Sequence, residues 1–479
     1  MAELCDRSPV LHRASSGNRF CTYFANGSCA YIDRSAYVEY CLPECNSVAG
    51  FVAHDRAGML RLEDAVSATE ERMRTQGALS PAGRVFMLKN NVAFMLKSNV
   101  ALSTGSMPEE VESTFGTHEN YSVNSEELGE ALRVNMDEVR GLAKFYHFSF
   151  DTANPLGYVA MLLVPFLVSR QILCGAGSVV SRQGKSHYQM SQRSRWMQSD
   201  IGDQTVNNRS IVNLRNEPHA AHYLRLHLIC GDANMCQYSN WLKMGTTGWV
   251  VRMIEENFLP PWFFQIGEAL PVLHMISEDV GLKEKFPVHY KQGEHHFSAI
   301  DMQQCFLDRA VELKDKNGAS PEEQFTLNVW QETLDLLRSD PQKLVGRIDW
   351  ITKQKLLEEY MQRSGLTLEH PRVQALDQKY HLLSQKDGAF YRWEAKNPSW
   401  KVVSDDAVVQ ARTVPPRTRA EARTRLAVQI HKSKGVVSGM DWDKVSTDEG
   451  TQVFALPDPF DPDPYPSDGV EHIVERDNS

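Results

Sequence analysis

Long hydrophobic runs are scarce in this sequence of 479 residues. The longest apolar stretch runs from Tyr158 to Val168, well short of the roughly 20 residues that a membrane-spanning helix needs. We therefore expect no membrane span. An excess of basic charge is also missing, because 51 lysines and arginines stand against 61 aspartates and glutamates, a net charge of −10. Binding along a nucleic-acid backbone favours the opposite sign, so the composition argues against a nucleic-acid partner.

Complete versions of the common metal and dinucleotide motifs are lacking as well. Cys41 and Cys45 lie close together, but no second pair and no clustered histidines complete a zinc set. The sequence Gly175-Ala176-Gly177 lacks the third glycine and the acidic residue of a dinucleotide-binding loop. The nine cysteines are scattered in apolar contexts and no secretory signal precedes them, so we expect reduced thiols in a cytoplasmic protein.

Acidic residues do occur in an unusual place, the mostly apolar segment from Asn26 to Gly58. We expect one extended segment with a bend near Arg34-Ser35, on which Asp33, Glu39 and Glu44 lie among apolar residues. Acids on an apolar strand face are costly to bury unless a metal, an amine or another cation meets them there. The same pattern also fits a half-exposed strand whose acids face water.

The rest of the chain shows mixed helix and strand patterns. Ser320-Pro321-Glu322-Glu323 is a capping box that predicts the start of a helix, and residues 348–360 predict a surface helix with one buried stripe. Residues 124–154 are acidic with helical spacing and predict an inserted surface helix. We expect a main domain over 1–397, a small domain over 398–460 and a disordered tail over 461–479.

Ordered sequence blocks along nearly the whole chain resemble one family. They are NGSCAYIDRSAYVEYCLPEC with HDRAG, then KNN, FGTHENY, PFLVSRQILCGAG, SQRS, NNRSIVNLRNEPHA, RLHLICGDANM, LKMGTT, IDWITKQKLLEEY and PPRTRA with DW. This order resembles the Pup–protein ligase family and its sister, the Pup deamidase/depupylase. The HDRAG continuation and the absence of a long loop before the NG segment favour the ligase branch.

The resemblance implies an α+β fold, the glutamine-synthetase-like carboxylate–amine ligase fold, in which an antiparallel sheet forms a cradle with helices behind it. It also implies ATP and Mg²⁺ as cofactors. The expected reaction transfers the ATP γ-phosphate to the C-terminal glutamate side chain of a Pup-like modifier, and a lysine of a protein substrate then attacks the acyl phosphate. Modified proteins would pass to the proteasome, an indirect partner.

Position by position, the resemblance implies roles for several residues. Asp33 matches the general base that deprotonates the lysine, and Tyr31 and Glu39 match two magnesium ligands. Hard oxygen donors suit magnesium, which keeps several waters. The family's opening Glu-x-Glu strand, a source of a further ligand, is not found before the NG segment. We expect Glu119 to replace this ligand. The alternative is that, without the missing ligand, the site no longer holds metal.

Nucleotide contacts are expected from Arg209 and Arg215, which flank a predicted strand at an even separation and so share a face. The alternative is that both arginines point into solvent. Trp442 matches a tryptophan at the family's nucleotide site, where a flat indole covers adenine. His219 is a further candidate, although a lone histidine is more often a hydrogen-bonded core residue.

Two positions depart from the family pattern: Cys29 stands in place of an ATP-binding arginine and Leu42 in place of a threonine. These departures and the missing strand favour a third possibility, a catalytically impaired homologue that binds modifier or substrate as an adaptor.

Overall fold

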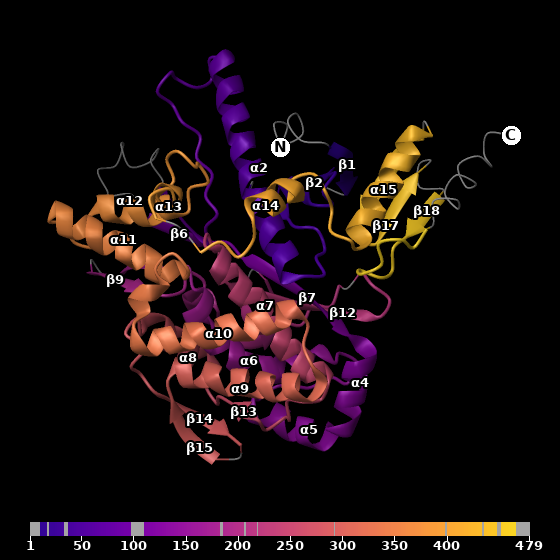
Figure 1. The fold of residues 1–479 in the computed structure, drawn as a ribbon, viewed down its shortest axis with the longest axis vertical. Helices are drawn as coiled ribbons and strands as arrows, with labels where there is room; N and C mark the ends of the chain where they lie inside the picture. The colour runs from indigo at the N-terminus through magenta and orange to yellow at the C-terminus, as the bar shows by residue number, and fades with distance from the viewer. Residues whose placement is uncertain are drawn as a thin grey trace.

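The computed structural model describes residues 10–16, 19–32, 37–96, 110–182, 185–205, 207–217, 219–291, 293–397, 400–433, 435–447 and 452–465. Helices and mostly antiparallel sheets are mixed along the chain, which is an α+β arrangement as expected. In Figure 1 the helices gather in the lower half, and the first sheet lies above them, between the long helix α2 (Val48–Thr75) and the C-terminal strands.

The core is built around helix α6 (Leu156–Cys174), whose side chains are all buried. Its length and mean hydropathy of 1.7 would suit a membrane span, but its complete burial is that of a central helix in a globular core. Helices α7 (Gln237–Glu255), α8 (Ala269–Glu278) and α9 (Ala299–Asn317) pack against it, and α10 (Pro321–Ser339) packs on α7 and α9. The predicted capping box at Ser320 is confirmed. The Ser320 hydroxyl accepts a hydrogen bond from the Glu323 amide, and the Glu323 carboxylate accepts one from the Ser320 amide.

The first sheet has the order β1-β2-β3-β4, with all strands antiparallel. Its strands are β1 (Val10–Ser16), β2 (Arg19–Phe24), β3 (Cys29–Ile32) and β4 (Val38–Cys41). Asn26 and Gly27 form the tight turn from β2 to β3, where Gly27 has a φ of +80° that favours glycine. A Cβ at Gly27 would lie 2.8 Å from Ala420, so this turn packs closely on a C-terminal helix.

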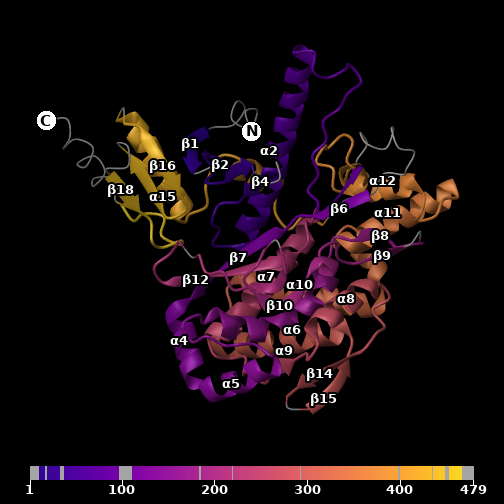
Figure 2. The same ribbon diagram turned by 180° about the vertical axis from the view of Figure 1, so that it is seen from behind.

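The second sheet has the order β10-β11-β12-β7 and lies on the helical core. Its strands are β7 (Thr117–Asn124), β10 (Ser199–Gly202), β11 (Ser210–Asn213) and β12 (Tyr223–Gly231). Figures 1 and 2 show β7 and β12 with the first sheet above them, helix α6 below and helix α7 beside them. The predicted helix within 124–154 is two helices, α4 (Ser125–Val134) and α5 (Met136–Phe145), separated at Asn135.

The C-terminal part contains α14 (Asp405–Ala411), which packs on α2, and then α15 (Arg419–Lys432) against a three-stranded sheet. That sheet has strands β16 (Val437–Asp441), β17 (Lys444–Thr447) and β18 (Gln452–Ala455). Helix α15 and these strands form a small cluster of their own, into which Tyr23 and Cys29 of the first sheet also pack. Figure 2 shows β16 and α15 beside β1 and β2. The domain boundary at 397/398 stays a prediction, and the predicted tail lies outside the described residues from 466 onward.

The remaining elements complete the outer layers. The predicted surface helix over 348–360 is confirmed as α11 (Asp349–Ser364), with Ile351 and Leu357 in its buried stripe. The others are β5 (Val92–Leu96), β6 (Glu110–Thr114), β8 (Ser178–Arg182), β9 (Lys185–Gln189), β13 (Phe264–Gln265), β14 (Phe286–Tyr290), β15 (Gly293–Phe297), α12 (Pro371–Tyr380), α13 (Ala389–Glu394) and the 3₁₀ turns η1 (Ser194–Trp196) and η2 (Pro341–Leu344).

Candidate functional site

Tyr31 and Glu39 lie directly opposite each other on the neighbouring strands β3 and β4. The Tyr31 hydroxyl hydrogen-bonds with the Glu39 carboxylate. Burial raises the pKa of Tyr31 well above its usual range, and the nearby thiol of Cys41 and carboxylate of Glu39 raise it further. Two oxygen donors therefore meet on one face of the first sheet. Asp33, the predicted base, lies outside the described residues.

The prediction of one extended segment with a bend is wrong, because β3 and β4 are antiparallel neighbours joined by a reversal of the chain. The alternation of side chains was assigned correctly within each strand, since Tyr31 shares its face with Cys29, and Glu39 shares its face with Cys41. The reversal brings Tyr31 and Glu39 closer together than a continuous strand would allow.

A polar face on strands β7 and β12 lies near this pair. Arg225 donates from Nε to Asn120 Oδ1 at 2.8 Å. Burial lowers the pKa of Arg225, and the groups that raise it include the phenol of Tyr31 and the thiol of Cys41, which places this guanidinium within electrostatic reach of the first sheet. The sequence block RLHLICGDANM contains Arg225, but its alternation with apolar neighbours, the signal for an inward-facing arginine, was not used.

His227 lies on the same face, two residues along β12 and directly opposite Asn120. Its ring lies 4.9 Å from that of His118. Burial, followed by the charge of Arg225, lowers the pKa of His227 to about 2, so the ring is neutral. Within the described residues neither ring nitrogen has a hydrogen-bond partner, although the residue is only 3% exposed. A buried imidazole of this kind is suited to contact a bound group.

Glu119 faces the other side of β7, which argues against its predicted role as a metal ligand. Alternate strand residues point to opposite faces, so His118 and Asn120 meet the polar face while Glu119 meets the core. Both carboxylate oxygens of Glu119 accept from Arg170 at 2.8 Å, and Tyr121 donates to one of them at 2.8 Å. Burial would raise the pKa of Glu119, but Arg170 lowers it below its usual value. The geometry favours a buried structural ion pair.

Glu44 also has a structural position, at the junction with the C-terminal part. Arg423 binds its two oxygens at 3.0 and 2.9 Å, and Arg419 binds one of them at 2.6 Å. Burial would raise the pKa of Glu44, but these arginines, Arg423 first, lower it to about 2. Arg423 also donates to the carbonyl of Trp442 at 2.8 Å and lies 5.1 Å from the centre of its ring.

Trp442 therefore lies beside the first sheet, with its ring edge-on to Tyr23 at 6.3 Å. His219 lies close by, and its Nδ1 is 3.8 Å from Oδ2 of Asp443. His219, Asp441 and Asp443 bring three possible ligand atoms within 4.8 Å of one another. All three residues are partly or fully exposed, so the cluster by itself does not define a metal site.

The predicted pair Arg209 and Arg215 does not share one strand, because β11 ends at Asn213. Arg209 lies near Arg193, whose pKa burial and the Arg209 charge lower to about 10. Arg215 is exposed and binds Glu217 at 2.7 Å, within electrostatic reach of Arg225 and His227. The even spacing was therefore misleading, although Arg215 does lie near the polar face.

The two departures from the family pattern have different surroundings. Cys29 is 2% exposed and packs with the α15 cluster, while Leu42 is half-buried just beyond β4. A strand, β1, does precede β2, but its sequence VLHRASS contains no glutamate. The described residues therefore supply two oxygen donors on this face, Tyr31 and Glu39, and no acid from β1.

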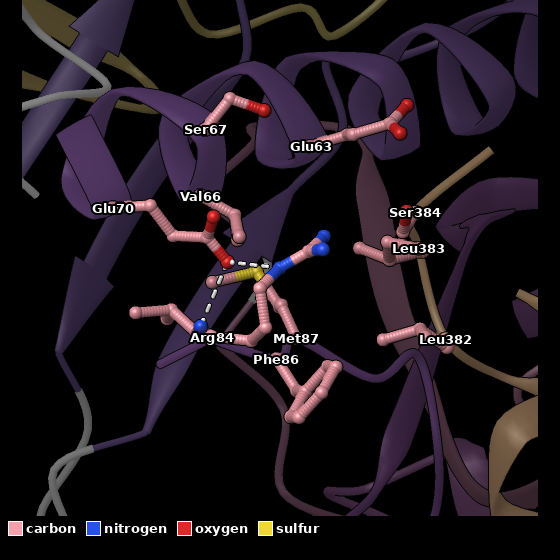
Figure 3. Close-up of a pocket in the computed structure, with 11 residues that line it drawn as sticks. Glu63, Val66, Ser67, Glu70, Arg84, Phe86, Met87, Leu382, Leu383 and Ser384 are labelled. Atoms are coloured by element: carbon pink, nitrogen blue, oxygen red, sulfur yellow. Dashed lines mark hydrogen bonds and ion pairs between the residues drawn. The ribbon is translucent and has the colours of Figure 1, made fainter. Parts of the chain in front are cut away.

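A pocket lies elsewhere, between α2 and residues 382–384 (Figure 3). One wall is formed by Glu70, which accepts from Arg84 Nε at 3.0 Å and from the Val85 amide at 2.8 Å (Figure 3). Arg74 donates to its second oxygen at 2.8 Å. These bonds occupy both oxygens of the Glu70 carboxylate. The residues that line this pocket are not those of the polar face, so we do not assign the pocket to the candidate site.

Clustered oxygen donors beside arginine and histidine side chains are typical of an enzyme that handles an anionic substrate. The Pup-ligase protein family model matches residues 5–446, so the chain belongs to the Pup ligase family. It is 32% identical over 446 residues to the Pup–protein ligase of Acidimicrobium ferrooxidans, covering 91% of this chain and 86% of that protein. It is 31% identical over 459 residues to the Pup–protein ligase of Kineococcus radiotolerans, with 95% and 89% covered.

Two solved structures resemble the fold. The Pup ligase PafA in complex with ADP has a TM-score of 0.75 and 26% identity, covering 95% of this chain and 89% of that one. The complex between Pup and PafA has a TM-score of 0.76 and 26% identity, covering 95% and 84%. The family prediction is thereby confirmed, and the chain is an enzyme of the ligase type.

Proposed function

We propose that this chain is an ATP-dependent ligase that joins the C-terminal glutamate side chain of a Pup-like modifier to lysines of substrate proteins. Its membership of the Pup ligase family supports this function, together with similar structures that contain ADP and Pup. The single structural observation in favour is the pairing of Tyr31 with Glu39 within electrostatic reach of Arg225.

This arrangement suits a glutamine-synthetase-like ligation. The phenol of Tyr31 and the carboxylate of Glu39 are hard oxygen donors, which fits magnesium with several retained waters. Magnesium, when bound, would neutralise charge on the transferred phosphoryl group. Arg225 offers planar donors to phosphate or carboxylate oxygens, and Trp442 offers an indole face to a nucleotide base.

The remaining assignments extend the same proposal. Asp33 is the base that takes a proton from the lysine ammonium, so that the neutral amine attacks the activated carboxylate. Arg215 contributes positive charge beside Arg225, whereas Arg209 acts at most through Arg193. The cell compartment is the cytoplasm, and the modified proteins are delivered to the proteasome.

A second function, an impaired homologue that binds modifier without ligating it, is favoured by one observation. Cys29 is buried in an apolar cluster at the position where the family resemblance implies an ATP-binding arginine. A depupylase remains the other activity of the wider family, and it would act on the same isopeptide bond.

The deciding experiment incubates the full chain with ATP, magnesium, a Pup-type modifier ending in glutamate and a lysine-bearing protein. The ligase proposal expects a conjugate whose mass is the sum of the two proteins less one water, which requires ATP and is lost in Asp33→Ala. Asp64→Ala is the matched control, because Asp64 lies on α2 and its carboxylate forms an ion pair with Arg412. Modifier binding without a conjugate would support the adaptor, and cleavage of a supplied conjugate would support the depupylase.

A further inference from the structure

Three cysteines lie on one face of three neighbouring strands in the first sheet. Cys29 of β3 is directly opposite Cys41 of β4. On its other side Cys29 is opposite Tyr23 of β2, and Cys21 is the next residue of β2 on that face. All three are free thiols, and they share this face with Tyr31 and Glu39.

Cys29 is the middle member of this group of three thiols, because β3 lies between β2 and β4. Cys29 is 2% exposed and lies between the other two, while Cys21 and Cys41 are half-buried at the border of the α15 cluster. On this face of the sheet the Cys29 side chain neighbours Cys41 directly and Cys21 diagonally.

We propose that Cys29 and Cys41 form a reversible disulfide, which makes this sheet a site of oxidation by hydroperoxides. Cβ atoms of directly opposite residues in an antiparallel pair lie about 4.5–5.5 Å apart, close to the ~3.5–4.5 Å of a disulfide. The diagonal pair of Cys21 and Cys29 is longer, since such neighbours lie about 7–8 Å apart. The strand register therefore selects Cys41 as the partner of Cys29.

The chemistry balances with one hydroperoxide. The half-buried Cys41 thiol loses its proton as its sulfur attacks the O–O bond of hydrogen peroxide and becomes a sulfenic acid, while the released hydroxide takes up that proton to form water. The Cys29 sulfur then attacks the Cys41 sulfur, the S–S bond forms, and the S–O bond breaks with release of a second water. Two thiols are oxidised and one peroxide is reduced. A dithiol reductant returns the disulfide to two thiols by thiol–disulfide exchange.

The Cys29–Cys41 disulfide would change the geometry of the neighbouring pair of residues. Tyr31 and Glu39 follow Cys29 and Cys41 as the next opposed residues on the same face of β3 and β4. A disulfide fixes the separation of the two strands at one pair and so changes the geometry at the next. This consequence rests on the proposed function, in which Tyr31 and Glu39 contact the metal–nucleotide complex.

The test is peptide mapping of the full chain after treatment with hydrogen peroxide and alkylation of the remaining thiols. Trypsin cuts after Arg19, Arg34 and Arg56, so Cys21 and Cys29 share the peptide 20–34. Cys41 and Cys45 share the peptide 35–56. The proposal expects these two peptides to be joined, with the loss of two hydrogen atoms, and to separate after dithiothreitol.

Four serine variants assign the link. Cys29→Ser and Cys41→Ser should abolish it, whereas Cys21→Ser and Cys45→Ser should keep it. The Cys45 thiol is a matched control because it hydrogen-bonds to the Pro43 carbonyl at 3.4 Å, outside the cluster. A disulfide between Cys21 and Cys29, within peptide 20–34, would contradict the pairing of Cys29 with Cys41. Unlinked peptides in which every cysteine is alkylated would show that this sheet is not a site of oxidation.

A second measurement tests the effect on nucleotide binding. Oxidation should weaken magnesium-dependent ADP affinity about tenfold, the lower end of the roughly 10–100-fold loss for a disturbed outer shell of a metal site, and dithiothreitol should restore it. A linked chain with unchanged ADP affinity would refute the effect on the site. A reduced chain that binds no ADP would refute the proposed function, while the mapping result would still decide the disulfide.

Discussion

Arg423 of α15 binds both carboxylate oxygens of Glu44, through Nη1 at 3.0 Å and Nη2 at 2.9 Å. The two residues are 379 positions apart in the sequence. The Thr418 hydroxyl adds a bond to the Glu44 carbonyl at 2.9 Å. These contacts hold the C-terminal part against the strand hairpin that carries Tyr31 and Glu39.

Replacing Glu44 by Gln should therefore destabilise the folded chain. Arg419 and Arg423 would remain buried without their countercharge, at a cost of about 3 kcal/mol, the lower end of the range for buried ion pairs. Thermal unfolding at pH 7 measures this loss as a fall in Tm. Glu421→Gln on the same helix is the control, because its partner Arg417 is exposed and should contribute little. Equal losses in both variants would contradict the anchoring role.

The same carboxylate predicts a dependence of stability on pH. The pKa of Glu44 is lowered from 4.5 to about 2 in the folded chain, so the unfolded chain binds its proton first as pH falls. The stabilisation from ionised Glu44 is full above pH 4.5 and is lost as pH falls toward 2. Urea titrations of wild type and Glu44→Gln should therefore converge in this window. A constant difference down to pH 2 would exclude Glu44 as the titrating group.

Replacing Glu119 by Gln should reduce stability and leave metal binding intact. The change leaves the buried Arg170 uncompensated, which costs about 3–5 kcal/mol. Calorimetry should find unchanged magnesium-dependent ADP affinity in the protein that remains folded. Replacing Arg170 by Gln in the same chain should recover part of the stability. A specific loss of magnesium dependence would restore the original assignment of Glu119.

Substitutions at Tyr31 and Glu39 should weaken metal and nucleotide binding and leave stability nearly unchanged. Tyr31→Phe and Glu39→Gln remove one oxygen donor or one negative charge and should weaken magnesium-dependent ADP binding about 10–100-fold. Thermal stability should change little, since both side chains are only half-buried. Glu63→Gln is the control, because its bonds to Gln385 lie on the exposed side of α2. Normal affinity in both site variants would remove them from the metal–nucleotide site.

Local sequence signals predicted helices and the face of a strand, but not how strands meet. The capping box at Ser320 depends on residues within one helical turn and was predicted correctly. The placement of Tyr31 opposite Glu39 depends on a chain reversal, and Arg225 reaches their neighbourhood from a strand nearly 200 positions away in the sequence. Spacing within one segment contains no information on such pairings.

The parity of strand residues explains why Glu119 lies away from the polar face. FGTHENY contains three polar residues in a row, and a strand divides them between its two faces. His118 and Asn120 reach the polar face, and Glu119 meets Arg170 in the core. A buried arginine in the apolar sequence PFLVSRQILC was the available signal that a carboxylate must accompany it.

The anchoring of Glu44 bears on how the chain can be divided. A protein cut after Lys396 would lose Arg419 and Arg423, and the acid at the end of β4 would keep its burial without a countercharge. The apolar surface of Tyr23 and Cys29, now covered by α15, would face water. The described residues of 419–456 therefore help to bury one face of the first sheet, and removing them would expose an aggregation-prone apolar face.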